Sequence, residues 1–149
     1  MTQETRFIPF HFNAGTVKVP HDWQDVSLLV LSSDGDHHGS SFTLSRDTLP
    51  WGLDFTQFAE REIHSLGQTL KNYQAIAQET GELNGITTVT SEFTWTSPQG
   101  PLHQLMMLLH LPEQILILTG TCVGTMTPVQ REQMKAMMTS FQPRPHDSE

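Results

Sequence analysis

Short runs rich in hydrophobic residues, separated by turn residues, make up the first part of the chain, and this pattern is typical of β-strands. Two such runs, FIPFHF and GTVKVP, are separated by the turn residues Asn13-Ala14-Gly15, which predicts a β-hairpin that ends at Pro20. Further strands are expected at about Val26–Ser32 and in SFTLS, on either side of the polar loop SSDGDHHGS. The first third of the chain is therefore predicted to consist of strands and turns.

A long amphipathic helix is predicted to follow these strands. Asp54 is a suitable N-cap residue, and Gln57 lies three positions later, which is the spacing of a capping box. Hydrophobic residues then recur at helical spacing as far as about Ala77, with Gly81 and Gly85 marking the exit. The residues of this stripe are Phe55, Phe58, Ala59, Ile63, Leu66, Leu70 and Tyr73.

The remainder of the chain predicts strands and a second helix. The strands are expected at about Ile86–Thr96, Leu102–Leu111 and Ile115–Cys122, joined by the turn sequences SPQGP and PEQ. Thr127-Pro128 supplies an N-cap followed by proline at the first helical position. The helix that begins there would carry Met134, Met137, Met138 and Phe141 on one stripe.

This order of elements predicts an α+β fold. We expect an antiparallel β-sheet with two amphipathic helices on one face, and an opposite face that forms a concave binding groove. Residues 1–143 would form a single domain, and residues 144–149 a flexible tail.

The strand near the N-terminus raises a question about its two faces. Leu28, Leu29, Val30 and Leu31 follow one another without a polar residue, although successive side chains of a strand point to opposite faces. One pair would meet the helices and the other would lie on the open face, and parity alone leaves open whether the open pair is Leu28 and Val30 or Leu29 and Leu31. A second subunit, a few tolerated exposed leucines or a bound ligand would each account for that open pair.

The same parity extends the open face to other strands. Between Leu102 and Leu111, one face carries Leu105, Met107, Leu109 and Leu111, whereas the other carries Gln104, Met106 and Leu108 among its residues. Ser41 alternates with Phe42 in the strand SFTLS. A face that mixes apolar side chains with hydroxyls and amides suits an amphipathic polypeptide guest, because the polar groups fix its register through hydrogen bonds.

Composition and charge narrow the classes of partner. The formal net charge of −8 argues against nucleic acid and against an anionic membrane surface. A single cysteine, Cys122, excludes an internal disulfide and fits a reducing compartment. Neither a signal peptide nor a run of about 18 apolar residues is evident, so a cytoplasmic location is expected.

No arrangement of reactive residues indicates an enzyme, and we expect neither a cofactor nor a metal. The loop DGDHHG gathers Asp34, Asp36, His37 and His38, but adjacent histidines without converging ligands are weak as a metal site. Phosphate-loop and nucleophile-elbow signatures are missing from the sequence. Glu62 lies on the apolar stripe of the first helix and would either reach out at its border or contact a partner.

Three quoted stretches carry a family resemblance over about Phe12 to Pro143. PHDWQDVSLLVL, then SFTLSRD, and later EFTW resemble the Eag-type effector-associated chaperones of type VI secretion, within a wider DcrB-like group with a Mog1/PsbP-like α+β fold. The resemblance implies a cytosolic homodimer that holds the N-terminal transmembrane segments of toxin effectors, often of the Rhs or PAAR kind. It also implies assistance in loading the effector onto the secretion spike.

The resemblance assigns candidate binding residues by position. Leu28 and Val30 would be apolar groove residues, and Ser41 would hydrogen-bond the guest. Gln104, Met106 and Leu108 extend the groove by strand parity, whereas Glu62 replaces the amide expected on the helix. Two alternatives remain, an adaptor for a soluble protein of the Mog1 type and a periplasmic DcrB-like protein, and the missing signal or lipobox counts against the latter.

Overall fold

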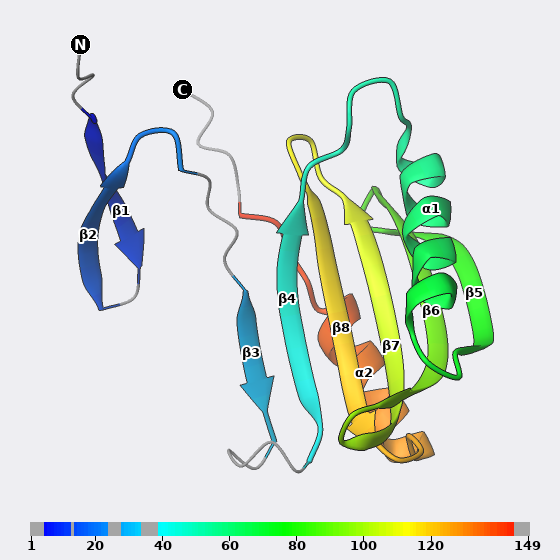
Figure 1. The fold of residues 1–149 in the computed structure, drawn as a ribbon. Coiled ribbons are helices and arrows are strands. Elements are labelled where there is room, and N and C mark those ends of the chain that lie inside the picture. The colour runs from blue at the N-terminus through cyan, green and yellow to red at the C-terminus, as the bar shows by residue number, and fades with distance from the viewer. Residues whose placement is uncertain (1–4, 13, 24–27, 34–38, 145–149) are drawn as a thin grey trace.

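The computed structural model describes residues 5–12, 14–23, 28–33 and 39–144 (Figure 1). Two of its strands form a hairpin of their own, and the other six form one antiparallel sheet in the order β3-β4-β8-β7-β6-β5. The elements are β1 (Phe7–Phe12), β2 (Gly15–Pro20), β3 (Leu29–Ser32), β4 (Ser41–Asp47), α1 (Phe55–Thr69), β5 (Gln74–Leu83), β6 (Ile86–Ser97), β7 (Gly100–His110), β8 (Ile115–Val123) and α2 (Pro128–Thr139). The predicted α+β fold is confirmed.

Both predicted helix starts are confirmed as capping boxes. The Gln57 backbone N–H donates to Asp54 Oδ1 at 2.8 Å, and the Asp54 N–H donates to Gln57 Oε1 at 3.1 Å. At α2 the Gln130 N–H donates to Thr127 Oγ1 at 3.1 Å, with the reciprocal bond at 2.8 Å. Each box satisfies backbone donors that the first turn of a helix leaves without an intrahelical acceptor.

The two helices lie on opposite faces of the sheet, so the prediction that both cover one face was wrong (Figure 1). We call these the α1 face and the α2 face. The α1 core combines Phe55, Phe58, Ala59 and Ile63 of the helix with Val89, Phe93, Met106, Leu108 and Ile115 of the sheet. The α2 core combines Met126, Met134 and Met138 with Phe42, Leu105, Met107, Leu109, Leu116, Leu118 and Cys122.

The physical reason for this arrangement is visible in β7. Its two parities are both apolar over Leu105–Leu109, so both faces of this strand need cover. A single layer of helix would have left one of them in water. Consecutive residues of β7 therefore belong alternately to the two cores, and the side chains from Leu105 to Leu109 are all buried.

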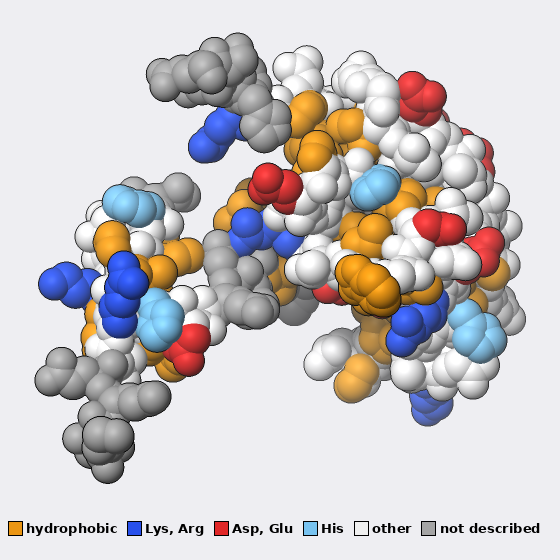
Figure 2. All heavy atoms as spheres, turned by 90° about the horizontal axis from the view of Figure 1, so that it is seen from above, with side chains coloured by type: hydrophobic (Ala, Val, Ile, Leu, Met, Phe, Trp, Pro, Cys, Tyr) orange, Lys and Arg blue, Asp and Glu red, His pale blue; other side chains and the backbone are white. Residues whose placement is uncertain are grey.

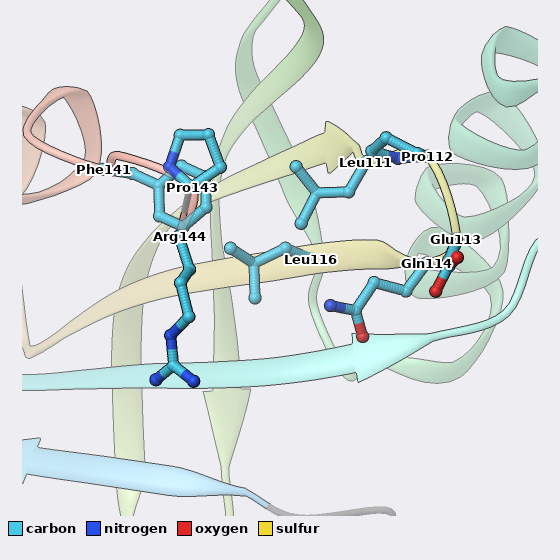
Figure 3. Close-up of a pocket in the computed structure, with 8 residues that line it drawn as sticks. All are labelled: Leu111, Pro112, Glu113, Gln114, Leu116, Phe141, Pro143 and Arg144. Atoms are coloured by element: carbon cyan, nitrogen blue, oxygen red, sulfur yellow. The ribbon is translucent and has the colours of Figure 1, made fainter. Parts of the chain in front are cut away.

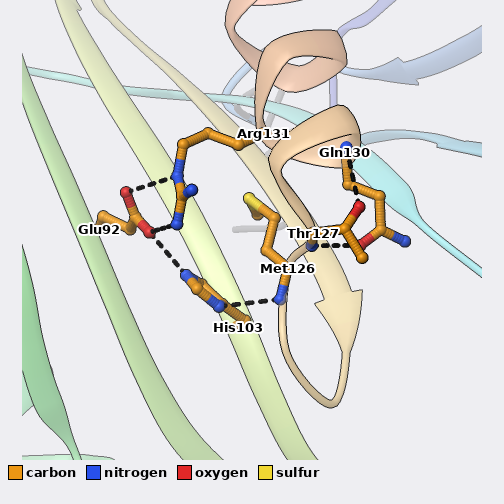
Figure 4. A network of polar contacts seen from close by, with 6 residues as sticks. All are labelled: Glu92, His103, Met126, Thr127, Gln130 and Arg131. Carbon is orange, nitrogen blue, oxygen red and sulfur yellow. Dashed lines mark hydrogen bonds and ion pairs between the residues drawn. The ribbon is translucent and has the colours of Figure 1, made fainter.

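A buried polar network joins α2 to the sheet (Figure 4). The Glu92 carboxylate accepts hydrogen bonds from Arg131 Nη2 at 2.6 Å and Arg131 Nε at 3.2 Å, and it contacts His103 Nε2 at 2.7 Å. The Met126 backbone N–H donates to His103 Nδ1 at 2.9 Å. Because that nitrogen accepts, the His103 proton lies on Nε2 and is donated to Glu92. The hydrogen bond and charge of Arg131 lower the pKa of Glu92 against the opposing effect of burial.

Strand β5 was not predicted, and α1 is shorter than the periodicity suggested. The helix ends at Thr69 rather than near Ala77, and Gln74–Leu83 pairs with β6 instead. Little alternation marks β5, since nearly all of it is exposed at the edge of the sheet. A usable signal was nevertheless present in Asn84-Gly85, which adopt positive φ angles of 50° and 82° between β5 and β6. That dipeptide is typical of a tight hairpin turn.

Candidate protein-binding site

Strand β3 exposes hydrophobic side chains on both of its faces. Leu29, Val30 and Leu31 are 61%, 50% and 59% exposed, and Leu28 just before the strand is 58% exposed. Among the strands that the structure describes, β3 lies at the end of the sheet and has β4 as its one partner. None of these four residues belongs to either core, so the apolar end of the sheet is left uncovered by both helices.

The register assigns each β3 residue to a face. Leu29 pairs with Leu44 and Leu31 with Phe42, both of which pack toward the α2 core. Val30 pairs with Thr43 and therefore lies on the α1 face. The predicted direction of Leu29 and Leu31 toward a helix-bearing face thus agrees with the register, but α2 does not reach them.

Cross-strand rows on the α1 face change from open to buried as they run from β3 to β6. One row pairs Val30, Thr43, Thr119 and Met106, and the next pairs Ser32, Ser41, Thr121, Gln104 and Phe93. The ends at Met106 and Phe93 are buried under α1, whereas the hydroxyl-bearing positions are half-exposed. We call the exposed and half-exposed part of these rows the open strip; it consists of Val30, Ser32, Ser41, Thr43, Thr119, Thr121 and Gln104.

Gln104 is held in a fixed orientation at the border of the open strip. Trp95 Nε1 donates to Gln104 Oε1 at 2.6 Å, and Gln104 Nε2 donates to Thr121 Oγ1 at 2.8 Å. An amide nitrogen has two protons and the oxygen two lone pairs, so each group retains capacity for one more hydrogen bond. Gln104 therefore offers both a donor and an acceptor at the border of the open strip.

The two predicted residues Met106 and Leu108 do not belong to this open surface. Both share a face with Gln104, as parity within the strand predicted, and the register places Val30 on that face too, but α1 packs over Met106 and Leu108 and buries them. The error follows from placing both helices on the other face. The structure therefore brings Val30, Ser41 and Gln104 together on one face and moves Met106 and Leu108 into the core.

Glu62 lies on α1 and is half-buried. It immediately precedes the buried Ile63, and Leu66 lies four residues later on the same side of the helix. A carboxylate at this position, at the border of the helix that covers the α1 face, can accept a hydrogen bond.

Sequence reasoning missed Trp51. It lies between β4 and α1 and is fully exposed, at 101% of the reference area. A large aromatic side chain in full contact with water is unusual for a folded chain and is a common anchor in protein contacts. The dipeptide Pro50-Trp51 before a turn glycine, Gly52, was the signal that could have pointed to it, since an indole on a turn has no core to enter.

The two edges of the sheet differ in chemistry. The β5 edge carries Glu79 and Glu82, together with a β-bulge between Ala75 and Ala77. Charges and bulges are the usual devices that prevent another strand from adding to an edge. Strand β3 has neither a charge nor a bulge over Leu29–Ser32. Of the two edges, β3 is the one left open to a partner.

Metal and membrane chemistry have no support in the described part of the chain. Among its side chains, no group of three or more His, Cys, Asp or Glu residues is placed to hold a metal ion. The predicted candidates Asp34, Asp36, His37 and His38 lie outside the described residues. Neither described helix has the length and hydropathy needed to span a bilayer.

Comparison with known proteins identifies the family and the fold. The family model described as DcrB matches residues 14–140. A protein of unknown function from Pseudomonas aeruginosa, PA94, has a similar structure, with a TM-score of 0.77, 19% identity, and coverage of 93% of this chain and 98% of that one. The PsbP protein of the cyanobacterium Synechocystis (CyanoP) gives a TM-score of 0.55, 9% identity and 94% coverage of both chains.

A weaker likeness extends to a Ran-binding protein. Mog1p from Saccharomyces cerevisiae gives a TM-score of 0.45 at 13% identity, over 91% of this chain and 85% of that one. Among curated proteins, no relative matches.

Proposed function

The chain belongs to the DcrB family, and from that premise we propose that it binds and shields an apolar polypeptide segment without catalysing a reaction. The observation that carries the proposal is the uncovered β3 edge, with its run of exposed leucines beside the hydroxyls and amide of the open strip. A monomeric soluble domain rarely leaves such a contiguous apolar surface exposed unless something binds there.

The chemistry of the open strip, together with Leu28 just before β3, suits a hydrophobic helix that is held outside a membrane. Leu28 and Val30 supply apolar contact, and burying their remaining surface is favourable by about 25 cal/mol per Å². Ser41, Thr43, Thr121 and Gln104 supply hydrogen-bond partners for hydroxyls or backbone groups of the guest. The contacts combine affinity with a preferred register, as peptide-binding surfaces require.

The finer proposal concerns the identity of the guest. We assign it to the N-terminal transmembrane helices of a type VI secretion effector of the Rhs or PAAR kind, held in the cytoplasm by a homodimer until the effector is loaded onto the secretion spike. The resemblance of PHDWQDVSLLVL and SFTLSRD to Eag-type chaperones supports this guest. Release then requires an environment that competes for the same apolar surface.

Co-expression with the N-terminal segment of the effector encoded by the neighbouring gene tests the proposal. The variant Leu28→Asp/Val30→Asp should lose capture of that segment in a pull-down. About half of each side chain remains to be buried by a guest, which is worth roughly 1 kcal/mol per residue, so the loss should be about 30-fold or more. Desolvation of the new carboxylates adds to it.

The matched control is Ile76→Asp on the opposite edge of the sheet, where an exposed apolar residue also becomes acidic. It should retain capture, and circular dichroism should show both variants folded. Retained capture by the Leu28→Asp/Val30→Asp variant would mean that the guest lies elsewhere. A second probe, a designed helix of about 20 Leu and Ala residues fused to a soluble carrier, separates recognition of hydrophobicity from recognition of sequence.

The alternative function is that of an adaptor for a soluble protein, of the Mog1 type. It predicts saturable binding of a folded partner that survives the loss of Leu28 and Val30 but responds to changes in polar surface residues. The adaptor would be favoured if the wild type captured neither the effector segment nor the designed helix, but did capture a soluble GTPase from the same cells.

A further inference from the structure

The turn between β4 and α1 displays an indole in water. Pro50 to Leu53 is closed by a hydrogen bond from the Leu53 backbone N–H to the Pro50 carbonyl at 3.2 Å, with Gly52 at a φ of 84°. A positive φ at the third position of a closed turn is typical of a type II turn, which places Trp51 at its corner. Leu49 and Leu53 pack against the α1 core, yet Trp51 between them is fully exposed. The two leucines therefore hold the turn in place and leave the indole in water.

One column of β4 side chains on the α1 face leads toward this turn and ends in a carboxylate. Asp47 pairs with Ile115, a residue of the α1 core, whereas the preceding Arg46 pairs with Leu116 of the α2 core. Successive side chains of a strand point to opposite faces, so Asp47 belongs to the α1 face and Arg46 does not. The column consists of Ser41, Thr43, Ser45 and Asp47, of which the first two belong to the open strip.

The Asp47 carboxylate is held in place and keeps acceptor capacity for a cation. Its Oδ1 accepts the Thr48 backbone N–H at 2.8 Å, and the residue is exposed. The ion pairs found among the described residues do not involve it. Asp54 lies three residues beyond Trp51, but its carboxylate caps α1 and is opposed by the positive end of the helix dipole. Figure 2 looks down on this end of the sheet and shows hydrophobic side chains at the surface, with acidic side chains among those around them.

The α2 face is less suited to a cation at the same end of the sheet. A hollow of about 320 Å³ lies there, with walls that include Leu116 and Phe141. Arg144 also lines it, and Figure 3 shows its side chain extending from the hollow toward β4. Glu113 and Arg144 together give the hollow no net charge. Asp47 on the α1 face is therefore the better partner for a cation.

A transmembrane segment is commonly flanked by basic residues, since the loops on its cytoplasmic side carry an excess of Lys and Arg. The column from Ser41 to Asp47 is about 20 Å long, which matches roughly 13 residues of a helix. A segment of about 20 apolar residues is longer than the column, so one of its flanks lies beyond Asp47, at the turn that carries Trp51. A lysine or arginine there meets a carboxylate and an indole ring, the best aromatic partner of a cation.

We propose that Asp47 and Trp51 receive a basic residue that flanks the hydrophobic segment of the guest, and so fix the direction in which the segment lies on the open strip. The assignment rests on the proposed function and adds a requirement to it, because the guest then needs a lysine or arginine next to its apolar residues. The net charge of −8 acts in the same sense by attracting a basic segment as a whole. Asp47 and Trp51 make that attraction local, at one end of β4.

Binding of designed helices tests the two residues on the full chain. The probe is the helix of about 20 Leu and Ala residues fused to a soluble carrier, with a pair of Lys, Ser or Glu residues at one end. The wild type should bind the Lys-flanked probe about 10-fold more tightly than the Glu-flanked probe. Asp47→Lys should reverse this order, and Trp51→Ala should reduce the difference to about 3-fold. Both variants should bind the Ser-flanked probe as the wild type does, which shows that they are folded.

Two matched controls separate a local contact from a general effect of charge or of apolar surface. Glu79→Lys makes the same change of charge on the exposed β5 edge, and Trp23→Ala removes another exposed tryptophan. Both should keep the preference of the wild type for the Lys-flanked probe. If Glu79→Lys reversed the preference as fully as Asp47→Lys, only the net charge of the chain would act, and the proposal would be overturned.

Disulfide trapping measures the direction of the segment. Thr48→Cys, beside Asp47, and Ser41→Cys, at the other end of the column, are each mixed with a Lys-flanked probe that carries one cysteine, either next to the lysines or at its far end. Cys122 is buried and does not compete. Thr48→Cys should trap the cysteine next to the lysines, and Ser41→Cys the cysteine at the far end. The reverse pattern, or equal trapping of both cysteines, would refute a direction fixed by Asp47 and Trp51.

The Ser-flanked probe distinguishes this proposal from the proposed function. A wild type that binds it, and that binds the Lys-flanked and Glu-flanked probes equally, would refute the role of Asp47 and Trp51 alone. A wild type that binds none of the three probes would refute the proposed function itself.

Discussion

The substitution Glu92→Gln is expected to loosen α2 from the sheet by removing the charge at the centre of the buried network. Glu92 accepts two hydrogen bonds from Arg131 and one from His103. Hydrogen bonds to a charged group are worth about 1.5–3 kcal/mol each. A glutamine keeps one oxygen that accepts one of them, and Arg131, whose side chain is 30% exposed, regains water.

The net loss in the free energy of unfolding should therefore be about 2–3 kcal/mol at pH 7. For a chain of this size, each kcal/mol lowers the Tm by about 2–4 °C, so a decrease of about 5–10 °C follows. Glu79→Gln is the matched control, because Glu79 is exposed on β5 and the same chemical change there should alter stability by less than about 0.5 kcal/mol.

The difference in stability between wild type and Glu92→Gln should decrease as the pH falls. Arg131 and His103 lower the pKa of Glu92 from its ordinary value of 4.5. A carboxyl group with a lowered folded-state pKa contributes stability above the unfolded value and loses it as the pH falls through the folded value. The gap between wild type and Glu92→Gln should thus be full at pH 7 and shrink below about pH 4.5.

Urea unfolding followed by tryptophan fluorescence at pH 7, 5 and 3.5 provides the measurement. The network would not be what holds α2 on the sheet if the free energies of unfolding of wild type and Glu92→Gln differed by less than about 0.5 kcal/mol at pH 7. The same conclusion would follow if the difference stayed constant as the pH fell.

Further substitutions test the packing on each face of the sheet. Gly120→Ala should cost about 1–3 kcal/mol in urea unfolding, because the new Cβ would lie 2.5 Å from Met134 Sδ. Leu108→Ala should cost about 2–5 kcal/mol, whereas Leu28→Ala should change stability by less than about 0.5 kcal/mol; equal costs would contradict the assignment of core and surface. Asp54→Ala should lower the free energy of unfolding by about 1 kcal/mol through loss of the cap, and a Tm scan would detect the change.

Local signals in the sequence predicted most of the elements correctly. The caps at Asp54 and Thr127, the hairpin ending at Pro20 and the strand pair around Pro112 are each encoded by residues close together in the chain. These properties depend only on short-range geometry. The family resemblance chose Val30 and strand parity chose Gln104, and the register places the two on one face.

The placement of the helices could not be read in the same way. Whether α1 covers Met106 or Met107 depends on the connection between β4 and α1, and both parities of β7 are equally apolar. The polar network at Glu92 was likewise invisible, because it joins residues from β6, β7 and α2. Contacts between distant parts of the chain can be assigned only from the tertiary fold. They determined which of the predicted site residues are exposed and which are buried.

The unguarded β3 edge has a consequence for the protein when it is empty. A strand at the end of a sheet with consecutive exposed hydrophobic side chains is a template for edge-to-edge aggregation. Nothing in Leu29–Ser32 counters this, in contrast to the acidic β5 edge. The empty chain should therefore lose solubility as its concentration rises, and production alongside its guest should restore it. The cell would then need to produce the protein and its guest in matching amounts, both to keep the protein in solution and to let it act.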